Sequence, residues 1–305
     1  MTNLKRFFAP LLGPVLMGLC LSCAAKTALV VSHPVVPVPE VSPAEQPMAA
    51  ASFDRVEADD INHVTLFFQL NVQNPRSSPA RLEIQDWKAA INGLNPGQGA
   101  ALTIAGDISQ GIPQVGAGAS LQVPLRLTVD LRTLSSDQED FDEYQADLDF
   151  NLGFIFDTRD IAEIMVTAKA AFPRIREPDF NITAIAIMKA ELINTRFKVK
   201  LRVDNPNIFP VALSSFSYEL YGADRFWADG EKTDILLIPA RGSAETELFL
   251  VMNFINMRRE LLDQIIAMKQ VNYRLAGEAE VRTNVDFLPH FLVDFDRSGK
   301  SVVID

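Results

Sequence analysis

Residues 197–213, FKVKLRVDNPNIFPVAL, carry the pattern that decides the fold. From Phe197 onward, apolar residues occupy every second position and Arg or Lys fills the positions between them. A strict period of two predicts a β-strand with one buried face and one face in water. Asn205-Pro206 then ends the strand, because proline lacks a backbone N–H donor and keeps the preceding residue extended. Pro210 opens the next strand at an edge position.

The same pattern, L-x-V-x-N-P-x-x-x-P-x-x-L, also occurs earlier in the chain. The matched residues are Leu70, Val72, Asn74, Pro75, Pro79 and Leu82 in the first copy, and Leu201, Val203, Asn205, Pro206, Pro210 and Leu213 in the second. The copies align without a gap, and Asn205 lies 131 positions after Asn74. Units this long are not solenoid repeats, so we predict two versions of one folded unit. Because an Asn side chain can bond its own downstream backbone, we interpret both asparagines as turn formers and not as ligands.

Composition sets broad limits on the class of protein. The chain has 305 residues, of which 48% are hydrophobic and 22% are charged, and its formal net charge is −11. This is an ordinary globular mixture, large enough for two cores. An acidic protein of this kind is a poor candidate for binding nucleic acid.

The N-terminus predicts export and lipid anchoring. Residues 1–22 combine basic residues near the start with an apolar stretch too short to span a bilayer comfortably, which is typical of a signal peptide. The sequence Leu-Ser-Cys-Ala around Cys23 resembles a bacterial lipobox, and Cys23 is the predicted lipidation site. Two alternatives stay open: Cys20 as the acceptor, or a plain cleaved signal with leftover cysteines. After cleavage before Cys23 no second cysteine remains, so stability has to come from core and sheet.

The rest of the chain divides into a tether and two predicted domains. Residues 23–52 contain five prolines and form the expected semi-rigid tether. The first β-sandwich is expected over 53–173, a short join with two prolines follows, and the second sandwich is expected over 179–305. Short strands with frequent turn signals predict antiparallel sheets throughout.

The expected elements are mostly strands. They are placed at 63–73, 80–92, 101–108, 119–131, 147–156, 162–172, 182–193, 196–204, 211–221, 233–238, 244–254, 271–283, 291–295 and 301–304. One short helix is expected in each domain, at 134–148 and at Met257–Met268, because apolar residues recur there at helical spacing.

With these pieces in order, the chain resembles the late embryogenesis abundant group 2 family, which is built on the WHy domain. The second domain carries the hallmark Asn205-Pro206-Asn207 after an alternating strand, an aromatic strand at 216–221, and an Ile-Pro-x-x-Gly turn that contains Pro239 and Gly242. The first domain is a more divergent copy, in which Arg76 replaces the second Asn.

The resemblance implies a fibronectin-type-III-like sandwich without catalytic activity or cofactor. It also implies an association with desiccation and stress tolerance, and in bacteria a small exported lipoprotein. The family has no agreed set of ligand-binding residues, so the motif residues are given a structural role. They are Asn74, Pro75, Pro79, Asn205, Pro206, Asn207, Pro210, Pro239 and Gly242.

The residues that carry chemistry are sparse. His33 lies in the tether, and His63 and His290 are single histidines beside strands, without the spacing of metal ligands. The segment 297–301, RSGKS, lacks the upstream Gly of a phosphate-binding loop. No catalytic residue, metal site or cofactor is therefore predicted.

Two charged features are candidate binding sites. Arg196, Lys198, Lys200 and Arg202 lie on the exposed face of one strand and suit an anionic ligand. The alternative is a cross-strand ladder with acids such as Glu278 and Glu280. The acidic run at 137–143 suits weak binding of divalent cations, or is simply the solvated start of a helix.

These observations lead to one main hypothesis and two alternatives. The main one is a non-enzymatic, lipid-anchored protein of the cell envelope, on the periplasmic face of the outer membrane, that protects or scaffolds under stress. Its partners are expected to be the membrane, through the anchor, and an unidentified envelope protein or lipid. The alternatives are a carrier for lipid or another apolar ligand, and an envelope hydrolase with an unrecognised site.

Overall fold

The computed structural model describes residues 45–104, 113–134, 141–157, 159–189, 195–223, 225–252, 267 and 270–304. Almost all of these residues lie in β-strands, which confirms the predicted all-β class. The strands before Arg174 are β1 (Met48–Ala58), β2 (His63–Gln73), β3 (Ala80–Ile91), β4 (Ala100–Ile104), β5 (Gln114–Val115), β6 (Ser120–Asp130), β7 (Glu143–Ile155) and β8 (Ile161–Pro173). Single 3₁₀ turns, η2 (Gly97–Gly99) and η4 (Leu131–Thr133), follow Pro96 and β6.

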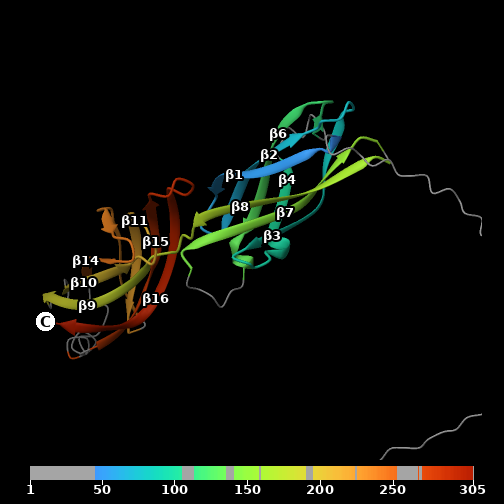
Figure 1. Cartoon of the computed structure of the whole chain (residues 1–305). Helices are drawn as coiled ribbons and strands as arrows, with labels where there is room; N and C mark the ends of the chain where they lie inside the picture. Colours follow the sequence, from blue (N-terminus) through green and yellow to red (C-terminus); the bar gives the residue numbers. More distant parts are fainter. Residues whose placement is uncertain are drawn as a thin grey trace, which may run out of the picture. The chain divides into compact units, whose positions relative to one another are not determined.

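The strands up to β8 form two four-stranded sheets that face each other. One has the order β1-β2-β6-β4 and the other β5-β3-β7-β8, and every pairing is antiparallel (Figure 1). Period-two alternation turns one face of each strand inward, as on β7, where Tyr144, Ala146 and Leu148 are buried and the residues between them are not. Side chains from both sheets share one hydrophobic core around Leu66, Leu82 and Phe154.

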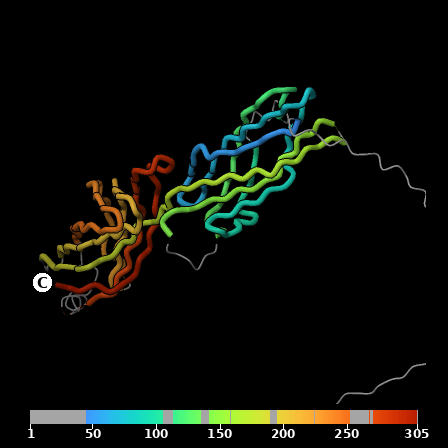
Figure 2. Tube along the Cα trace, in the orientation of Figure 1, coloured from blue at the N-terminus to red at the C-terminus, as the bar shows by residue number. Residues whose placement is uncertain are grey.

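The strands after residue 178 form a single curled sheet. They are β9 (Asp179–Lys189), β10 (Thr195–Asp204), β11 (Val211–Gly222), β12 (Arg225–Lys232), β13 (Leu236–Ile238), β14 (Ser243–Met252), β15 (Gln270–Thr283) and β16 (His290–Ile304). The order along the eight-stranded sheet is β12-β11-β15-β16-β9-β10-β14, with β13 pairing to β11. Figure 2 traces the long β15–β16 hairpin in red at the C-terminal end of the chain.

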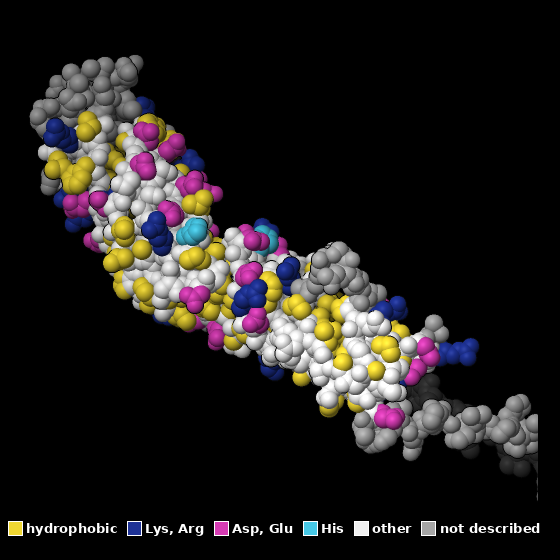
Figure 3. All heavy atoms as spheres, turned by 90° about the horizontal axis from the view of Figure 1, so that it is seen from above, with side chains coloured by type: hydrophobic (Ala, Val, Ile, Leu, Met, Phe, Trp, Pro, Cys, Tyr) yellow, Lys and Arg dark blue, Asp and Glu magenta, His cyan; other side chains and the backbone are white. Residues whose placement is uncertain are grey.

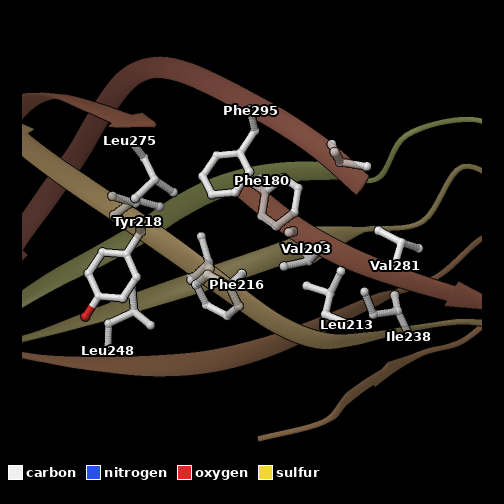
Figure 4. Close-up of a cluster of buried hydrophobic side chains, with 14 of the residues drawn as sticks. Phe180, Val203, Leu213, Phe216, Tyr218, Ile238, Leu248, Leu275, Val281 and Phe295 are labelled. Carbon is white, nitrogen blue, oxygen red and sulfur yellow. The ribbon is translucent and has the colours of Figure 1, made fainter. Parts of the chain in front are cut away.

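The inner face of this curled sheet encloses a second hydrophobic core. Figure 4 shows Phe180 of β9 and Phe295 of β16 packed against each other, with Phe216 and Tyr218 of β11 in the same cluster. The rings of Phe180 and Phe295 stack with centroids 4.3 Å apart. Aromatic side chains from strands far apart in the sequence thus close the core, and each buries a large apolar area.

The expected helix at 134–148 is wrong over its described C-terminal part. Glu143–Leu148 belong to β7 and pair with β8. Tyr144 and Leu148 are four positions apart, and an even spacing fits one face of a strand as well as one face of a helix. The second expected helix, Met257–Met268, lies outside the described residues except for Ala267, which is helical.

Several strands differ from the expected set, among them β5 (Gln114–Val115), which lies where no strand was expected. β1 begins at Met48, so residues 48–52 of the expected tether lie in a strand, and β12 had not been anticipated. The segments expected as separate strands at 291–295 and 301–304 form one strand, β16. The end of β16 pairs with β9 in parallel, an exception to the expected antiparallel pairing, and joins what would otherwise be two sheets.

Candidate functional site

Asn205 organises the turn that follows β10. Its Nδ2 donates to the carbonyl oxygens of Phe209, at 2.8 Å, and Pro239, at 3.0 Å, while its Oδ1 accepts from the backbone nitrogen of Asn207 at 3.0 Å. The side chain is buried, with 2% of its surface exposed. Every polar atom of the amide is therefore used to hold backbone, and none is available to a ligand.

Asn74 makes the corresponding bonds in the first half of the chain. Its Nδ2 donates to the carbonyl oxygens of Ser78, at 2.7 Å, and Gly116, at 3.0 Å, and its Oδ1 accepts from the backbone nitrogen of Arg76 at 3.1 Å. The facing turns match as well, since Asn74 N bonds Ala119 O and Asn205 N bonds Gly242 O. We call each arrangement an Asn-Pro turn, and the two have the same hydrogen-bond plan.

A left-handed residue lies at the same place in both facing turns. Gly118 has φ +64° and Arg241 has φ +47°, and their backbone nitrogens donate to Arg76 O and Asn207 O. A non-glycine residue tolerates this conformation only at a cost, so Arg241 is held there by its surroundings.

The third motif position links each Asn-Pro turn to the segment that precedes its core. Asn207 Nδ2 donates to Arg176 O at 2.9 Å and its Oδ1 accepts from Arg176 N at 2.7 Å. Arg76, which occupies this position in the first copy, donates from Nε to Glu45 O at 3.2 Å. Sequence reasoning missed these partners, because the acceptors are the backbone carbonyl oxygens of residues 45 and 176, which every residue type carries.

The basic row lies on the outer face of β10, as its period predicts. Lys198 Nζ is 3.2 Å from a carboxylate oxygen of Glu247 on β14, and Arg202 pairs with Asp204 at 2.7 Å. The acids opposite the row are Glu245 and Glu247, since β10 pairs with β14. Glu278 and Glu280, expected in that role, lie on β15, which is not a neighbour of β10.

The acidic run at 137–143 is described only from Phe141 onward. Asp142 lies 3.7 Å from the guanidinium of Arg176 and also pairs with Arg241. Residues 137–140, like Cys20, Cys23 and His33, lie outside the described part of the chain.

His63 belongs to a polar cluster at the start of β2. Its Nδ1 is 2.8 Å from Asp60 Oδ2, and its Nε2 is 2.8 Å from Arg132 Nη2. Because arginine only donates, Nε2 accepts and the proton of the neutral ring lies on Nδ1. The Arg132 guanidinium also forms two hydrogen bonds to Asp130, and together with a third from the Arg132 backbone N–H they lower the pKa of this carboxyl to about 2. These contacts stabilise the β1–β2 and β6 loops and leave no free base. His290, at the start of β16, is exposed opposite Arg282.

Few other features suggest chemistry. Within the described ranges, no three His, Cys, Asp or Glu side chains are grouped so as to hold a metal ion. None of the helical residues described belongs to a segment long and apolar enough to cross a bilayer. Charged side chains of both signs are interspersed over the face seen in Figure 3.

An open groove lies on the first half of the chain. It has a volume of about 860 Å³ and is lined by the starts of β1 and β6, the end of β2, and β8. Met48 and Met165 contribute exposed apolar surface, and Asn71, Gln73 and Gln122 contribute polar groups. The volume is in the range of small-molecule sites.

The fold and the two Asn-Pro turns define an all-β protein whose repeated motif residues stabilise backbone. Residues 200–294 match the family model described as Late embryogenesis abundant protein, LEA_2. This stretch contains Asn205, Asn207 and Gly242. No curated protein matches the chain.

Several solved structures are similar at low identity. An Archaeoglobus fulgidus protein is 14% identical, with a TM-score of 0.25, and the match covers 42% of this chain and 96% of that one. A solution structure from Arabidopsis thaliana is 15% identical, with a TM-score of 0.33, covering 44% and 87%. A Bacteroides uniformis β-glucuronidase is 11% identical, with a TM-score of 0.25, covering 77% and 26%. With TM-scores this low, these likenesses define neither a fold nor an activity.

Proposed function

We propose that this protein is a non-enzymatic stress-protection or scaffolding protein of the cell envelope, built from two tandem WHy-like domains. The observation that carries the proposal is the match of residues 200–294 to the late embryogenesis abundant model, a stretch that contains the complete second Asn-Pro turn. The polar side-chain atoms of Asn205 are all used in hydrogen bonds to backbone groups of that turn, so they are not available to a substrate. This supports a protein that acts through its surface instead of through a catalytic site.

The tandem arrangement draws its support from the two Asn-Pro turns. Asn74 and Asn205 each bond the carbonyl four residues downstream and a carbonyl in the facing turn. Each turn belongs to its own hydrophobic core. A duplicated gene segment explains both the 131-residue displacement and the shared hydrogen-bond plan.

Export and anchoring rest on the N-terminal sequence alone. The basic start, the short apolar stretch and the lipobox-like residues before Cys23 support lipidation of this cysteine and attachment to the periplasmic face of the outer membrane. Palmitate labelling of cells that produce the full chain tests this step. Cys23→Ala should abolish the label and Cys20→Ala should retain it, and the opposite result would move the acceptor to Cys20.

The physiological role is tested by deletion and complementation. A strain without the protein should survive drying and osmotic upshift less well, and the wild-type chain should restore survival. Cys23→Ala should restore it only in part if anchoring matters. Unchanged survival, together with no envelope partner recovered by crosslinking, would count decisively against this function.

A second candidate is a carrier for an apolar ligand, favoured by the groove of about 860 Å³ with its two exposed methionines. Native mass spectrometry of the purified full chain would detect a co-purifying lipid. If the Met48→Asp/Met165→Asp variant loses the lipid, the binding site is this groove. If no lipid co-purifies with the wild-type chain, the carrier function is rejected and the scaffolding function remains.

A further inference from the structure

The outer face of β9, β10, β14 and the end of β16 combines exposed apolar side chains with cations. The apolar members are Met188, Phe249, Val251, Val302 and Ile304, and the cations are Arg196, Lys198, Lys200 and Lys300. We call this set the cationic-apolar face. Monomeric proteins rarely gather large exposed apolar residues in one place without an interaction to explain them.

The hydrogen-bond register shows that these residues are neighbours. Phe249 lies opposite Lys198, Lys198 opposite Ala186, and Ala186 opposite Ile304, so one row crosses four strands. The next row runs from Glu247 through Lys200 and Ala184 to Val302, and Val251 lies opposite Arg196. Directly opposed residues on one face of a sheet are in side-chain contact range.

The apolar side chains of this face are open to solvent. Phe249, Val251 and Met188 have 64%, 60% and 57% of their surfaces exposed. The residues that lie between them on the same strands and point to the other face, such as Leu248, Leu250 and Val199, are almost fully buried. The exposed set is therefore a second apolar surface, separate from the core.

The charges of the face are only partly neutralised. Glu247 forms an ion pair with Lys198 and lies directly opposite Lys200 in the register, so one carboxylate faces two cations, and Arg196 forms no ion pair with a described residue. The opposite flank of the same curled sheet, over β11, β12, β15 and the first half of β16, carries charges of both signs, including the ion pairs Arg274–Asp296 and Arg282–Glu280. A shallow depression there is lined by Glu219, Asp229, Glu231, Glu278 and Asp294. A chain with a net charge of −11 thus turns cations outward beside exposed apolar groups on one flank.

We infer that the cationic-apolar face docks on the surface of a bilayer that contains anionic phospholipid. Apolar burial at the headgroup boundary and attraction of cations to anionic lipids are the two contributions that give interfacial binding, and this face supplies both. The acids that line the depression on the opposite flank are repelled by the same surface, so the second core would be oriented as well as bound. The inference does not depend on the proposed anchor, because it rests only on described residues of the sheet.

Vesicle binding of the full chain tests the docking. We expect stronger sedimentation with equimolar phosphatidylcholine and phosphatidylglycerol than with phosphatidylcholine alone, and a loss of this difference at high salt. Arg196→Gln/Lys200→Gln should lower the anionic-lipid partition coefficient about fivefold for each cation removed. Phe249→Ser/Val251→Ser should lower it about tenfold or more. All variants share one N-terminus, so its contribution is common to them.

Matched controls replace similar residues elsewhere. Ile235→Ser/Leu237→Ser removes two exposed apolar residues outside the face, and Arg81→Gln/Arg225→Gln removes two exposed cations. These variants should bind as the wild type does. Equal binding by the face variants and the controls would overturn the inference.

A direct depth measurement keeps the test valid if the N-terminus alone holds the chain on vesicles. Phe249→Trp should be quenched by brominated anionic lipid, after subtraction of the signal from Trp87 and Trp227 in the unsubstituted chain. Leu237→Trp should not be quenched. Absence of quenching at position 249 would refute docking. Evidence that the face mediates self-association, or binds an acidic protein, without contacting lipid would refute it as well.

Discussion

Asn207 and the backbone of Arg176 form two reciprocal hydrogen bonds, from Asn207 Nδ2 to Arg176 O and from Arg176 N to Asn207 Oδ1. They attach the segment that enters the second core to its Asn-Pro turn. In the first copy Arg76 donates to Glu45 O, and it also bonds both carboxylate oxygens of Asp160 and lies over the ring of Phe156. One motif position therefore performs the same attachment with two different side chains.

Substitution at this position should loosen the incoming segment in each copy. Asn207→Ala should lower the free energy of unfolding by about 1–3 kcal/mol, since it leaves backbone groups of Arg176 unpaired. Limited proteolysis with mass spectrometry should show faster cleavage near Arg176. Arg76→Ala should act in the same way near Glu45, and cleavage rates unchanged at both sites would contradict the attachment.

Asn205 should be among the most sensitive positions in the second core. Asn205→Ala removes three bonds to buried backbone and should cost about 2–4 kcal/mol in unfolding free energy. Asn74→Ala should cost a similar amount in the first core. Denaturant unfolding followed by hydrogen exchange assigns each loss to its core, and the exposed Asn284→Ala serves as the control.

Gly277 is required by its neighbour strand. A Cβ at this position would lie 2.0 Å from Ser217 O, a backbone atom of β11 that cannot move aside without breaking the pairing. Gly277→Ala should therefore destabilise by about 1–3 kcal/mol or more, as overpacking does. Gly116→Ala, whose Cβ would meet only Ala119 Cβ at 3.5 Å, should be close to neutral in the same thermal unfolding assay.

Trp227 is buried in the second core and its Nε1 has no hydrogen-bond partner in the described structure. Trp227→Phe removes this unsatisfied donor along with some apolar area, so the two effects oppose each other and the net change should stay within about 1 kcal/mol. Trp227→Ala should cost about 3–5 kcal/mol, because the stacking partner Phe197 then faces a cavity. A large loss in the Phe variant, measured by chemical denaturation, would mean that the indole N–H has a partner.

Acid should weaken the loop cluster around Asp130. The pKa of Asp130 is lowered to about 2 by hydrogen bonds from Arg132, whereas an unfolded Asp titrates near 3.9. A depressed carboxyl pKa contributes stability that is complete above about pH 4 and is lost as pH falls toward about 2. Unfolding midpoints of Asp130→Asn should therefore lack part of the wild-type decline across this window. Parallel pH profiles for the two proteins would contradict the assignment.

Sequence reasoning succeeded where a pattern is local. The alternation of Phe197, Val199 and Leu201 identified β10 because period two directly reports a half-buried strand. It failed at 143–148, where an even spacing satisfied both helix and strand, and at Met48, where alanine-rich sequence before Phe53 carries little strand signal.

The sequence predicted the cations of the candidate surface but not their neighbours on adjacent strands. Arg196, Lys198, Lys200 and Arg202 were recognised as one exposed row, because they are two apart on a single strand. Their true neighbours, Glu247 and Phe249 on one side and Ala186 on the other, depend on strand order, which no local pattern encodes.

By itself, the sequence determined the all-β class, the two Asn-Pro turns and the inward and outward faces of most strands, because these follow from spacing and from the backbone limits of proline and asparagine. Only the tertiary structure decided which strands are neighbours and that β16, by pairing with β9 in parallel, joins what would otherwise be two sheets. It also decided that exposed Phe249 and Ile304 share one row with Lys198. Which strands pair depends on contacts between residues far apart in the sequence. The entropic cost of closing a loop rises only slowly with loop length, so distance along the chain does not identify the partner strand.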